Sequence, residues 1–323
     1  METTARIYVA GHRGMVGSAI VRLLQRKGYH NLLLQTSQEL DLRDSRRATE
    51  FFDHARPEYV FFAAARVGGI LANSSYPADF IYDNLAIQTN VIHAAHLAGT
   101  KKLLFLGSSC IYPRDCLQPI KEEYLLTGPL EPTNEWYAVA KIAGIKMCQA
   151  YRKQYSCDFI AAMPTNLYGP GDNFDLETSH VLPALIRRFH EAKLTGKSPR
   201  LWGTGKPRRE FLHVDDCAEA CASLMERYSD SRIINVGAGE DISIAELARM
   251  IADIAGYEGT IEWDHSKPDG MPRKLLDCHR INELGWSPGI GLHEGLRKTY
   301  QWYENRGAPG PKDKSVSIAS AGL

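Results

Sequence analysis

The sequence predicts an α/β fold, in which a doubly wound parallel sheet is followed by a smaller α/β lobe. Short apolar runs alternate with helical patterns through the first half of the chain, and a glycine-rich turn joins the first run to the first helix. After Pro164 the elements become shorter, which predicts the second lobe. We expect a Rossmann domain over 1–165 that regains 210–240, and a discontinuous lobe over 166–306.

Five apolar runs in the first half have the length and composition of buried strands. Tyr59–Ala64 is apolar on both faces, as a parallel strand between two layers of helices should be. The other predicted strands are Arg6–Ala10, Leu32–Leu34, Leu103–Gly107 and Phe159–Met163. The helices predicted between them are Met15–Lys27, Ser45–Arg56 with Asp44 as its cap, Ala78–Ala98 and Trp136–Tyr155. Strands separated by helices indicate parallel pairing.

The second half carries shorter predicted elements. Asn166–Asp175 is rich in Gly, Pro and Asn and is predicted to be a loop, whereas Ile233–Val236 is predicted to return to the first sheet. The remaining predicted elements are helix Leu182–Ala192, strand Phe211–Val214, and helices Asp216–Tyr228, Ile244–Ala255 and Leu292–Tyr303. Residues 307–323 lack periodicity, which predicts a disordered tail.

The composition excludes several classes of protein. Of 323 residues, 44% are hydrophobic, and 38 Lys and Arg balance 38 Asp and Glu, which argues against a generally basic nucleic-acid binder. Since no apolar stretch reaches the ~18 residues of a membrane span, we expect neither nucleic acid nor membrane as a partner. Seven cysteines without a Cys-x-x-Cys pair, and a start without signal-peptide features, favour a reduced, cytoplasmic protein without a metal site.

The turn after the first strand contains three glycines at regular spacing. Glycines let the backbone approach a pyrophosphate, and the helix N-terminus directs free N–H groups at it. A glycine-rich turn without a ligand is the alternative, but the turn follows a strand and opens a helix, which is typical of a dinucleotide site. The candidate residues are Gly11, His12, Arg13, Gly14, Met15, Val16 and Gly17.

The end of the second strand favours NADP over NAD. NAD sites place an acid on the ribose 2′-OH there, but this chain has Thr36-Ser37 and no carboxylate before Glu39. Arg13 lies inside the glycine turn, where it could meet a 2′-phosphate, although it could also be merely solvated. Asp41 and Leu42 follow as candidates for the adenine pocket.

Tyr137 and Lys141 lie four residues apart on a predicted helix, which places both side chains on one face. A nearby ammonium favours phenolate, so we expect the pKa of Tyr137 to fall below its usual ~10. Such a phenol suits proton donation to a ketone oxygen as a hydride arrives, and Ser108 could donate a second hydrogen bond. The Tyr-x-x-x-Lys pair alone is common by chance, but with the glycine turn it predicts an oxidoreductase.

Four segments give the chain a resemblance to the extended short-chain dehydrogenase/reductase superfamily, and within it to the GDP-L-fucose synthase family. They are Ala10–Ser18, Gly107–Pro113, Met163–Pro170 and Arg209–Asp216, and the match extends from Arg6 to Tyr303. The resemblance implies a bifunctional enzyme that inverts C3 and C5 of GDP-4-keto-6-deoxy-D-mannose and reduces its C4 ketone with NADPH. It also implies a homodimer built from the long helices of the first domain.

The resemblance assigns roles to individual residues. Cys110 and His180 become the base and acid of epimerisation, and Ser108, Tyr137 and Lys141 serve the carbonyl. Cys110 lies two residues after Ser108, and alternate residues of a strand point to the same side. Further cofactor contacts are implied at Leu106, Gly107, Ser109, Lys141, Pro164, Asn166, Leu167 and His180. Substrate contacts are implied at Arg188, Trp202, Arg209 and Asp277.

One departure from the family concerns the 2′-phosphate. A basic residue is expected at the end of the second strand in NADP-preferring members, and this chain has Thr36-Ser37 there. The phosphate charge is therefore left mainly to Arg13.

Three other functions remain open on the sequence. An NDP-sugar 4-epimerase with tightly held NAD would return its hydride and would not need Cys110 with His180. A 4,6-dehydratase would want an acid beside Ser108, and Ser109-Cys110 supplies none. A non-catalytic NADP-sensing protein on this fold would be expected to lack Tyr137. Stoichiometric NADPH consumption separates a reductase from the 4-epimerase and the sensor.

Overall fold

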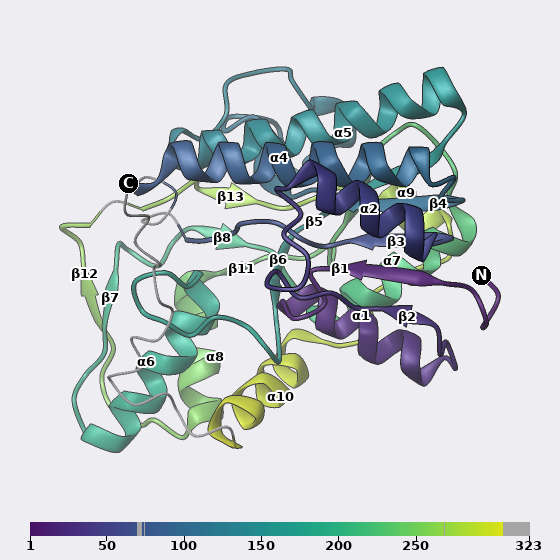
Figure 1. Ribbon diagram of the computed structural model, residues 1–323. Coiled ribbons are helices and arrows are strands. Elements are labelled where there is room, and N and C mark those ends of the chain that lie inside the picture. Colours follow the sequence, from purple (N-terminus) through teal and green to yellow (C-terminus); the bar gives the residue numbers. More distant parts are fainter. Residues whose placement is uncertain (70–72, 74, 268, 306–323) are drawn as a thin grey trace, which may run out of the picture.

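Six parallel strands form the central sheet (Figure 1). They are β1 (Ile7–Ala10), β2 (Leu32–Leu33), β3 (Tyr59–Phe62), β4 (Lys102–Leu106), β5 (Asp158–Pro164) and β10 (Ile234–Val236). Their order is β10-β5-β4-β3-β1-β2, and every neighbouring pair is parallel. The structure is a computed structural model that describes residues 1–69, 73, 75–267 and 269–305, so the predicted tail lies outside the described residues. The predicted α/β fold and the return of β10 to the sheet are confirmed.

Helices cover both faces of this sheet. They are α1 (Met15–Arg26), α2 (Ser45–Ala55), α4 (Pro77–Leu97), α5 (Glu135–Tyr155) and α7 (Val214–Arg227). On one face α4 packs against α5 and α2, and on the other α1 packs against α7 (Figure 1). The predicted cap of α2 is confirmed, because the Asp44 carboxylate accepts hydrogen bonds from the N–H groups of Arg46 and Arg47, at 3.0 and 3.1 Å. In the described part of the chain, no helix is long and apolar enough to cross a membrane.

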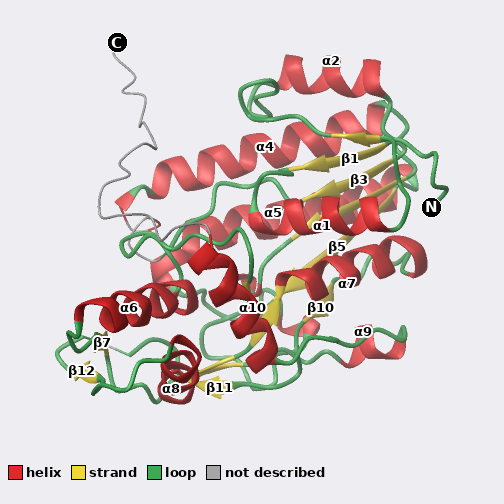
Figure 2. Cartoon of the chain, turned by 90° about the horizontal axis from the view of Figure 1, so that it is seen from below, coloured by secondary structure: helices red, strands yellow, loops and turns green. Residues whose placement is uncertain are grey.

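The second lobe lies at one end of the sheet (Figure 2). Its helices are α6 (Val181–Thr195), α8 (Ile244–Ala255) and α10 (Leu292–Asn305). Its strands are β6 (Asn166–Tyr168), β7 (Arg200–Trp202), β8 (Arg208–Arg209), β9 (Phe211–His213), β11 (Ile242–Ser243), β12 (Glu262–Asp264) and β13 (Arg273–Lys274). They form three small sheets: β11-β8-β13, β12-β7 and β6-β9. A separate apolar core fills this lobe, with Phe189, Leu247 and Ile251 fully buried.

Part of the predicted loop 166–175 is a strand. Asn166–Tyr168 pairs in parallel with Phe211–His213, so the loop prediction is wrong for these three residues. The two glycines and the one proline of this stretch all follow Tyr168. The Tyr168 side chain is buried and packs edge-on against the His213 ring, with 5.4 Å between ring centroids. Burial of this aromatic side chain therefore outweighs the turn-like composition.

A buried asparagine joins β10 to the segments on either side of it. The Asn235 side chain accepts a hydrogen bond from the Tyr112 hydroxyl at 2.6 Å and donates to the carbonyls of Ile120 and Asp277 at 2.9 and 3.0 Å. Its backbone N–H donates to the Glu122 carboxylate at 3.0 Å. Asn235 is fully buried. Among the described residues, the Tyr112 hydroxyl and the Asp277 carbonyl have no other hydrogen-bond partner, whereas the Ile120 carbonyl also accepts a bond from the Asp277 N–H at 2.8 Å.

We predict that Asn235→Leu lowers the free energy of unfolding by about 3 kcal/mol, because it leaves the Tyr112 hydroxyl and the Asp277 carbonyl without their partner. Urea denaturation followed by circular dichroism measures this change. Asn31→Ala is the control, because the exposed Asn31 makes one long bond, 3.4 Å, to the Thr4 carbonyl. Equal effects of the two substitutions would contradict this role for Asn235.

Candidate active site

The glycine turn is built by close backbone contacts. Gly11 has a φ of +82°, and a Cβ there would lie 2.8 Å from the Ala64 nitrogen. A Cβ on Gly17 would lie 2.1 Å from the Gly11 carbonyl oxygen. Gly14 caps α1 without a side-chain bond, and the first turn of this helix contains no acidic residue. The free N–H groups at this helix end therefore fit an anionic group such as a dinucleotide pyrophosphate.

Two polar side chains of this turn lack partners within the described residues. The Arg13 side chain is exposed and makes no hydrogen bond or ion pair there. The His12 Nδ1 atom is buried without a hydrogen-bond partner. Glu39 accepts a hydrogen bond from the Thr36 N–H at 2.8 Å, which lowers the pKa of Glu39, and the nearby Arg13 lowers it further. Arg13 thus lies at the end of β2, where the sequence predicts a 2′-phosphate.

Asp41 and Leu42 differ in what they can offer a cofactor. The Asp41 carboxylate accepts hydrogen bonds from Arg43, at 3.0 Å from its N–H and its Nε and at 2.8 Å from its Nη2. These bonds lower the pKa of Asp41 and occupy both of its oxygens. Leu42 is buried and apolar. An adenine contact here would therefore be made by Leu42 and the backbone rather than by the Asp41 carboxylate.

The candidate residues on the nicotinamide side gather where β4 and β5 end. These strands are neighbours, with Leu106 opposite Ala162, so their following residues meet at one edge of the sheet. A Cβ on Gly107 would lie 2.4 Å from the Met163 sulfur, so a larger residue there would have to displace the end of the Met163 side chain. Ser109 is buried, and the Asn166 amide donates to the Glu210 carbonyl at 2.8 Å. This edge also holds Leu106, Pro164 and Leu167.

Lys141 is held between helix α5 and the end of β4. Its ammonium donates to the Leu106 carbonyl at 2.7 Å and lies 5.8 Å from the centroid of the Tyr137 ring. Burial lowers the pKa of Lys141 to about 8. Burial also raises the pKa of Tyr137, with the nearby Cys110 adding to the rise. The expected lowering of the Tyr137 pKa is wrong, because desolvation of the phenolate outweighs the attraction of the ammonium.

Ser108 and Cys110 share one turn rather than one strand. Ser108 caps the short 3₁₀ helix Ser109–Ile111, and its Oγ accepts a hydrogen bond from the Cys110 N–H at 3.3 Å. The expectation that strand alternation aligns the two side chains is therefore wrong, although the turn still brings them together. Cys110 is buried, which raises the pKa of its thiol, while Lys274, Ser108 and Lys141 act in the opposite direction.

His180 lies at the N-terminus of α6, as its cap residue. Desolvation lowers the pKa of His180, and the ammonium of Lys274 lowers it further. Lys274 lies opposite Arg209 in the parallel pair β13–β8. Burial lowers the pKa of Lys274, and the Cys110 thiolate opposes this effect. One ammonium therefore interacts with both Cys110 and His180.

Sequence reasoning missed Lys274. The available signal was a lysine directly before the apolar pair Leu275-Leu276, both of which are buried. A cation at the start of a buried run needs a polar partner or a ligand, because an unpaired buried charge is costly.

The candidate substrate residues lie on α6, β7 and β8. Arg188 makes no hydrogen bond or ion pair with any residue that the structure describes. Trp202 is 67% exposed, with the Lys267 ammonium 5.5 Å from its ring centroid. Arg209 donates to the Met271 carbonyl at 2.6 Å, and burial lowers its pKa. This part of the lobe thus offers two cations and one exposed aromatic face.

The fourth candidate, Asp277, follows β13 in the chain. Its carboxylate accepts a hydrogen bond from the His279 N–H at 2.9 Å, at the start of α9 (His279–Glu283). Asp269 is an acid near Arg209, and its charge raises the pKa of the Arg209 guanidinium. Asp269 accepts hydrogen bonds from the N–H and hydroxyl of Thr204, at 2.8 and 2.6 Å. Among the described residues, no three His, Cys, Asp or Glu side chains gather as a metal site would require.

Comparisons with known proteins agree with this geometry. Residues 7–237 match the model of the NAD dependent epimerase/dehydratase family. GDP-L-fucose synthase 1 of Arabidopsis thaliana is 59% identical over 303 residues, which cover 94% of each chain.

Two solved structures extend the likeness to three dimensions. A GDP-mannoheptose C4 reductase from Campylobacter jejuni, with NADP bound, gives a TM-score of 0.88 at 43% identity, covering 94% of this chain and 99% of that one. A GDP-L-fucose synthetase from Naegleria fowleri, bound to NADP, gives 0.89 at 29% identity, covering 95% and 96%. The chain therefore belongs to the NAD dependent epimerase/dehydratase family and, within it, to the GDP-L-fucose synthases.

Proposed function

We propose that this enzyme converts GDP-4-keto-6-deoxy-D-mannose to GDP-L-fucose, by inverting C3 and C5 and reducing the C4 ketone with NADPH. The observation that carries the proposal is the position of Lys274, whose ammonium is near enough to lower the pKa of both Cys110 and His180. The thiolate of Cys110 in turn raises the pKa of both Tyr137 and Lys141, which places it near them. A simple ketone reductase needs only the tyrosine and the lysine, so the added thiol and imidazole support a second acid–base reaction.

One carbonyl can serve both reactions. C3 and C5 flank the C4 ketone, so loss of a proton from either carbon gives an enolate whose charge rests on the carbonyl oxygen. Hydrogen bonds from Tyr137 and Ser108 to that oxygen would stabilise the enolate. The same bonds polarise the ketone for reduction.

Cys110 and His180 are suited to the two faces of these carbons. Burial raises the pKa of the Cys110 thiol, and the Lys274 ammonium offsets part of this rise by favouring the thiolate. A lowered pKa makes protonated His180 a better proton donor. Cys110 would remove the proton from one face, and His180 would return one to the other.

Tyr137 and Lys141 serve the reduction. NADPH supplies the hydride when it is bound at the glycine turn. The raised pKa of Tyr137 keeps its phenol protonated at neutral pH, so its proton is available to the C4 oxygen. The Lys141 ammonium, held by the Leu106 carbonyl, then stabilises the phenolate that remains.

The second lobe would bind the nucleotide part of the substrate. Arg188 and Arg209 can bind the diphosphate, and Trp202 offers an exposed ring for stacking. Asp277 is the acidic contact that the family resemblance implies, and Asp269, whose charge raises the pKa of Arg209, is a further acid of this lobe.

We also propose a cytoplasmic homodimer. Five large hydrophobic side chains of α4 and α5 are exposed: Tyr82, Leu97, Trp136, Val139 and Tyr155. Such side chains on two adjacent helices support an interface with a second copy. All seven cysteines are free thiols, which supports a reducing compartment.

A second candidate is reduction at C4 without epimerisation, which the likeness to the heptose C4 reductase favours. Incubation with GDP-4-keto-6-deoxymannose and NADPH in D₂O distinguishes the two. The proposal expects one NADPH oxidised per sugar and deuterium at both C3 and C5 of the product. NADPH oxidation without deuterium would leave a C4 reductase, and no oxidation would leave the 4-epimerase or the sensor.

We predict that Arg13→Ala raises the KM for NADPH by about 10-fold or more, because a charge-assisted bond to the 2′-phosphate is lost. The KM for NADH should change less than about 2-fold. Initial rates with both cofactors measure this. Arg46→Ala is the control, because among the described residues the Arg46 side chain pairs with the exposed Glu50 alone, and the bond of its backbone N–H to Asp44 is kept in the variant. Equal changes for NADPH and NADH would remove Arg13 from the 2′-phosphate.

We predict that Tyr137→Phe lowers NADPH oxidation by about 1,000-fold while deuterium exchange at C3 and C5 persists.

We predict that Cys110→Ser lowers the rate of deuterium exchange by about 100-fold, because the base is lost. Reduction should then slow as well, because the epimerised ketone is no longer supplied. Mass spectrometry of the sugar and absorbance of NADPH give the two readouts. If Cys110→Ser forms fucose at the wild-type rate, Cys110 is not the base.

The pKa of Lys141 predicts a pH limit. The ammonium form is needed, so kcat/KM for NADPH oxidation should be highest below pH 8 and should fall above it as Lys141 loses its proton. In Lys141→Arg, whose guanidinium stays charged, this decline should vanish even if the rate is lower. A wild-type profile that is flat to pH 9.5 would contradict the role of this ammonium.

A further inference from the structure

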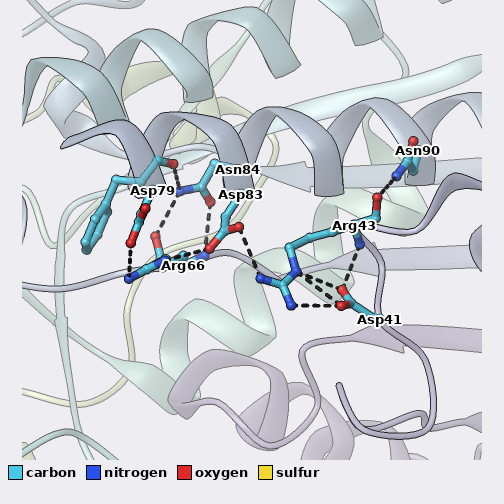
Figure 3. Close-up of polar contacts among 8 residues, drawn as sticks. Asp41, Arg43, Arg66, Asp79, Asp83, Asn84 and Asn90 are labelled. Atoms are coloured by element: carbon cyan, nitrogen blue, oxygen red, sulfur yellow. Dashed lines mark hydrogen bonds and ion pairs between the residues drawn. The ribbon is translucent and has the colours of Figure 1, made fainter. Parts of the chain in front are cut away.

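A buried carboxylate on α4 binds two arginines from different loops (Figure 3). One oxygen of Asp83 lies 2.8 Å from Nη1 of Arg66, and the other lies 3.3 Å from Nη1 of Arg43. The Asp83 side chain is only 11% exposed, and Arg66 also pairs with Asp79 at 3.2 Å. If either arginine is removed, Asp83 keeps the other, so its buried charge is never left alone.

Arg66 is also fixed through its backbone. The Asn84 side chain accepts a hydrogen bond from the Arg66 N–H and donates one to the Arg66 carbonyl, both at 3.0 Å. The Arg66 guanidinium lies 5.3 Å from the centroid of the Phe80 ring. Helix α4 therefore holds the chain firmly at the point where it leaves β3 (Figure 3).

Three residues further on, this segment contacts the second lobe. The Gly69 N–H donates to the Thr178 carbonyl at 3.0 Å. A Cβ on Gly69 would lie 3.0 Å from the carbonyl oxygens of both Thr178 and Ser179, so the two backbones meet directly. His180 follows Ser179 and caps α6. The segment 66–69 thus lies against the two residues that precede the imidazole.

The turn before His180 is rigid within itself. The Asp175 carboxylate accepts hydrogen bonds from the N–H and hydroxyl of Thr178, at 3.0 and 2.9 Å, and the Asp175 carbonyl accepts one from the Ser179 N–H at 2.9 Å. A rigid turn moves as a unit. The contact with Gly69 joins this turn to the segment that follows β3.

We propose that Arg66 is a positioning residue for His180. It fixes the 66–69 segment on α4, and this segment holds the His180 turn at the distance that proton donation requires. Arg43 pairs with the same carboxylate but contacts the loop after β2, so it should not share this role. The inference rests on the proposed function, because it takes His180 as the proton donor of epimerisation.

The test compares Arg66→Leu with Arg43→Leu. Deuterium exchange at C3 and C5 is measured in D₂O with saturating GDP-4-keto-6-deoxymannose and saturating NADP⁺, which cannot reduce the sugar. We expect the exchange rate to fall about 10-fold or more in Arg66→Leu and to stay within about 2-fold in Arg43→Leu, because a misplaced acid slows proton transfer. Both variants keep one arginine on Asp83, so similar losses of Tm are expected.

Two further variants separate positioning from folding. Arg66→Lys keeps a cation for Asp83 and should restore most of the exchange. Gly69→Ala leaves the ion pairs intact but forces the two backbones apart, so it should slow the exchange like Arg66→Leu while NADP⁺ affinity stays within about 2-fold.

The outcomes are distinct. Unchanged exchange in Arg66→Leu and Gly69→Ala, or equal losses in Arg66→Leu and Arg43→Leu, would overturn the inference. If the wild-type protein itself shows no exchange, the proposed epimerisation fails and this role of Arg66 falls with it.

Discussion

The hydrogen bond from the Lys141 ammonium to the Leu106 carbonyl, 2.7 Å long, is the contact on which the site depends. It joins helix α5 to the end of β4, so it sets the position of Tyr137 on one side and of Ser108 and Cys110 on the other. The ammonium is buried, which lowers its pKa to about 8. Its positive charge is stabilised by the Leu106 carbonyl and by the rings of Phe105 and Tyr137. A buried cation of this kind is costly for folding and useful for chemistry.

The second lobe adds a further charge to this arrangement. The pairing of β13 with β8 places Lys274 beside Arg209, and Lys274 acts on both Cys110 and His180. In the proposed mechanism, the Rossmann sheet supplies the groups that bind the carbonyl, and the second lobe supplies the acid and a cation near the thiol. Both proposed activities would then use one carbonyl, and we propose that the contact between the segments 66–69 and 178–179 affects epimerisation alone.

The sequence predicted the features that repeat or follow local rules. The parallel sheet, the cap of α2 and the glycine turn all follow from periodicity and side-chain chemistry over a few residues. The interactions of Lys274 with Cys110 and of Asp269 with Arg209 could not be predicted, because each joins distant parts of the chain. The Tyr137 pKa was predicted in the wrong direction, because spacing on a helix reveals a neighbour but not the depth of burial.

A crystal structure with NADP⁺ and GDP-4-keto-6-deoxymannose, using a Tyr137→Phe variant to prevent turnover, would test the central claim most directly. The account predicts that the Cys110 sulfur and the His180 ring lie on opposite faces of the sugar, each within roughly 4 Å of C3 or C5, which is close to hydrogen-bond reach. A complex in which either side chain lies far from both carbons would contradict it.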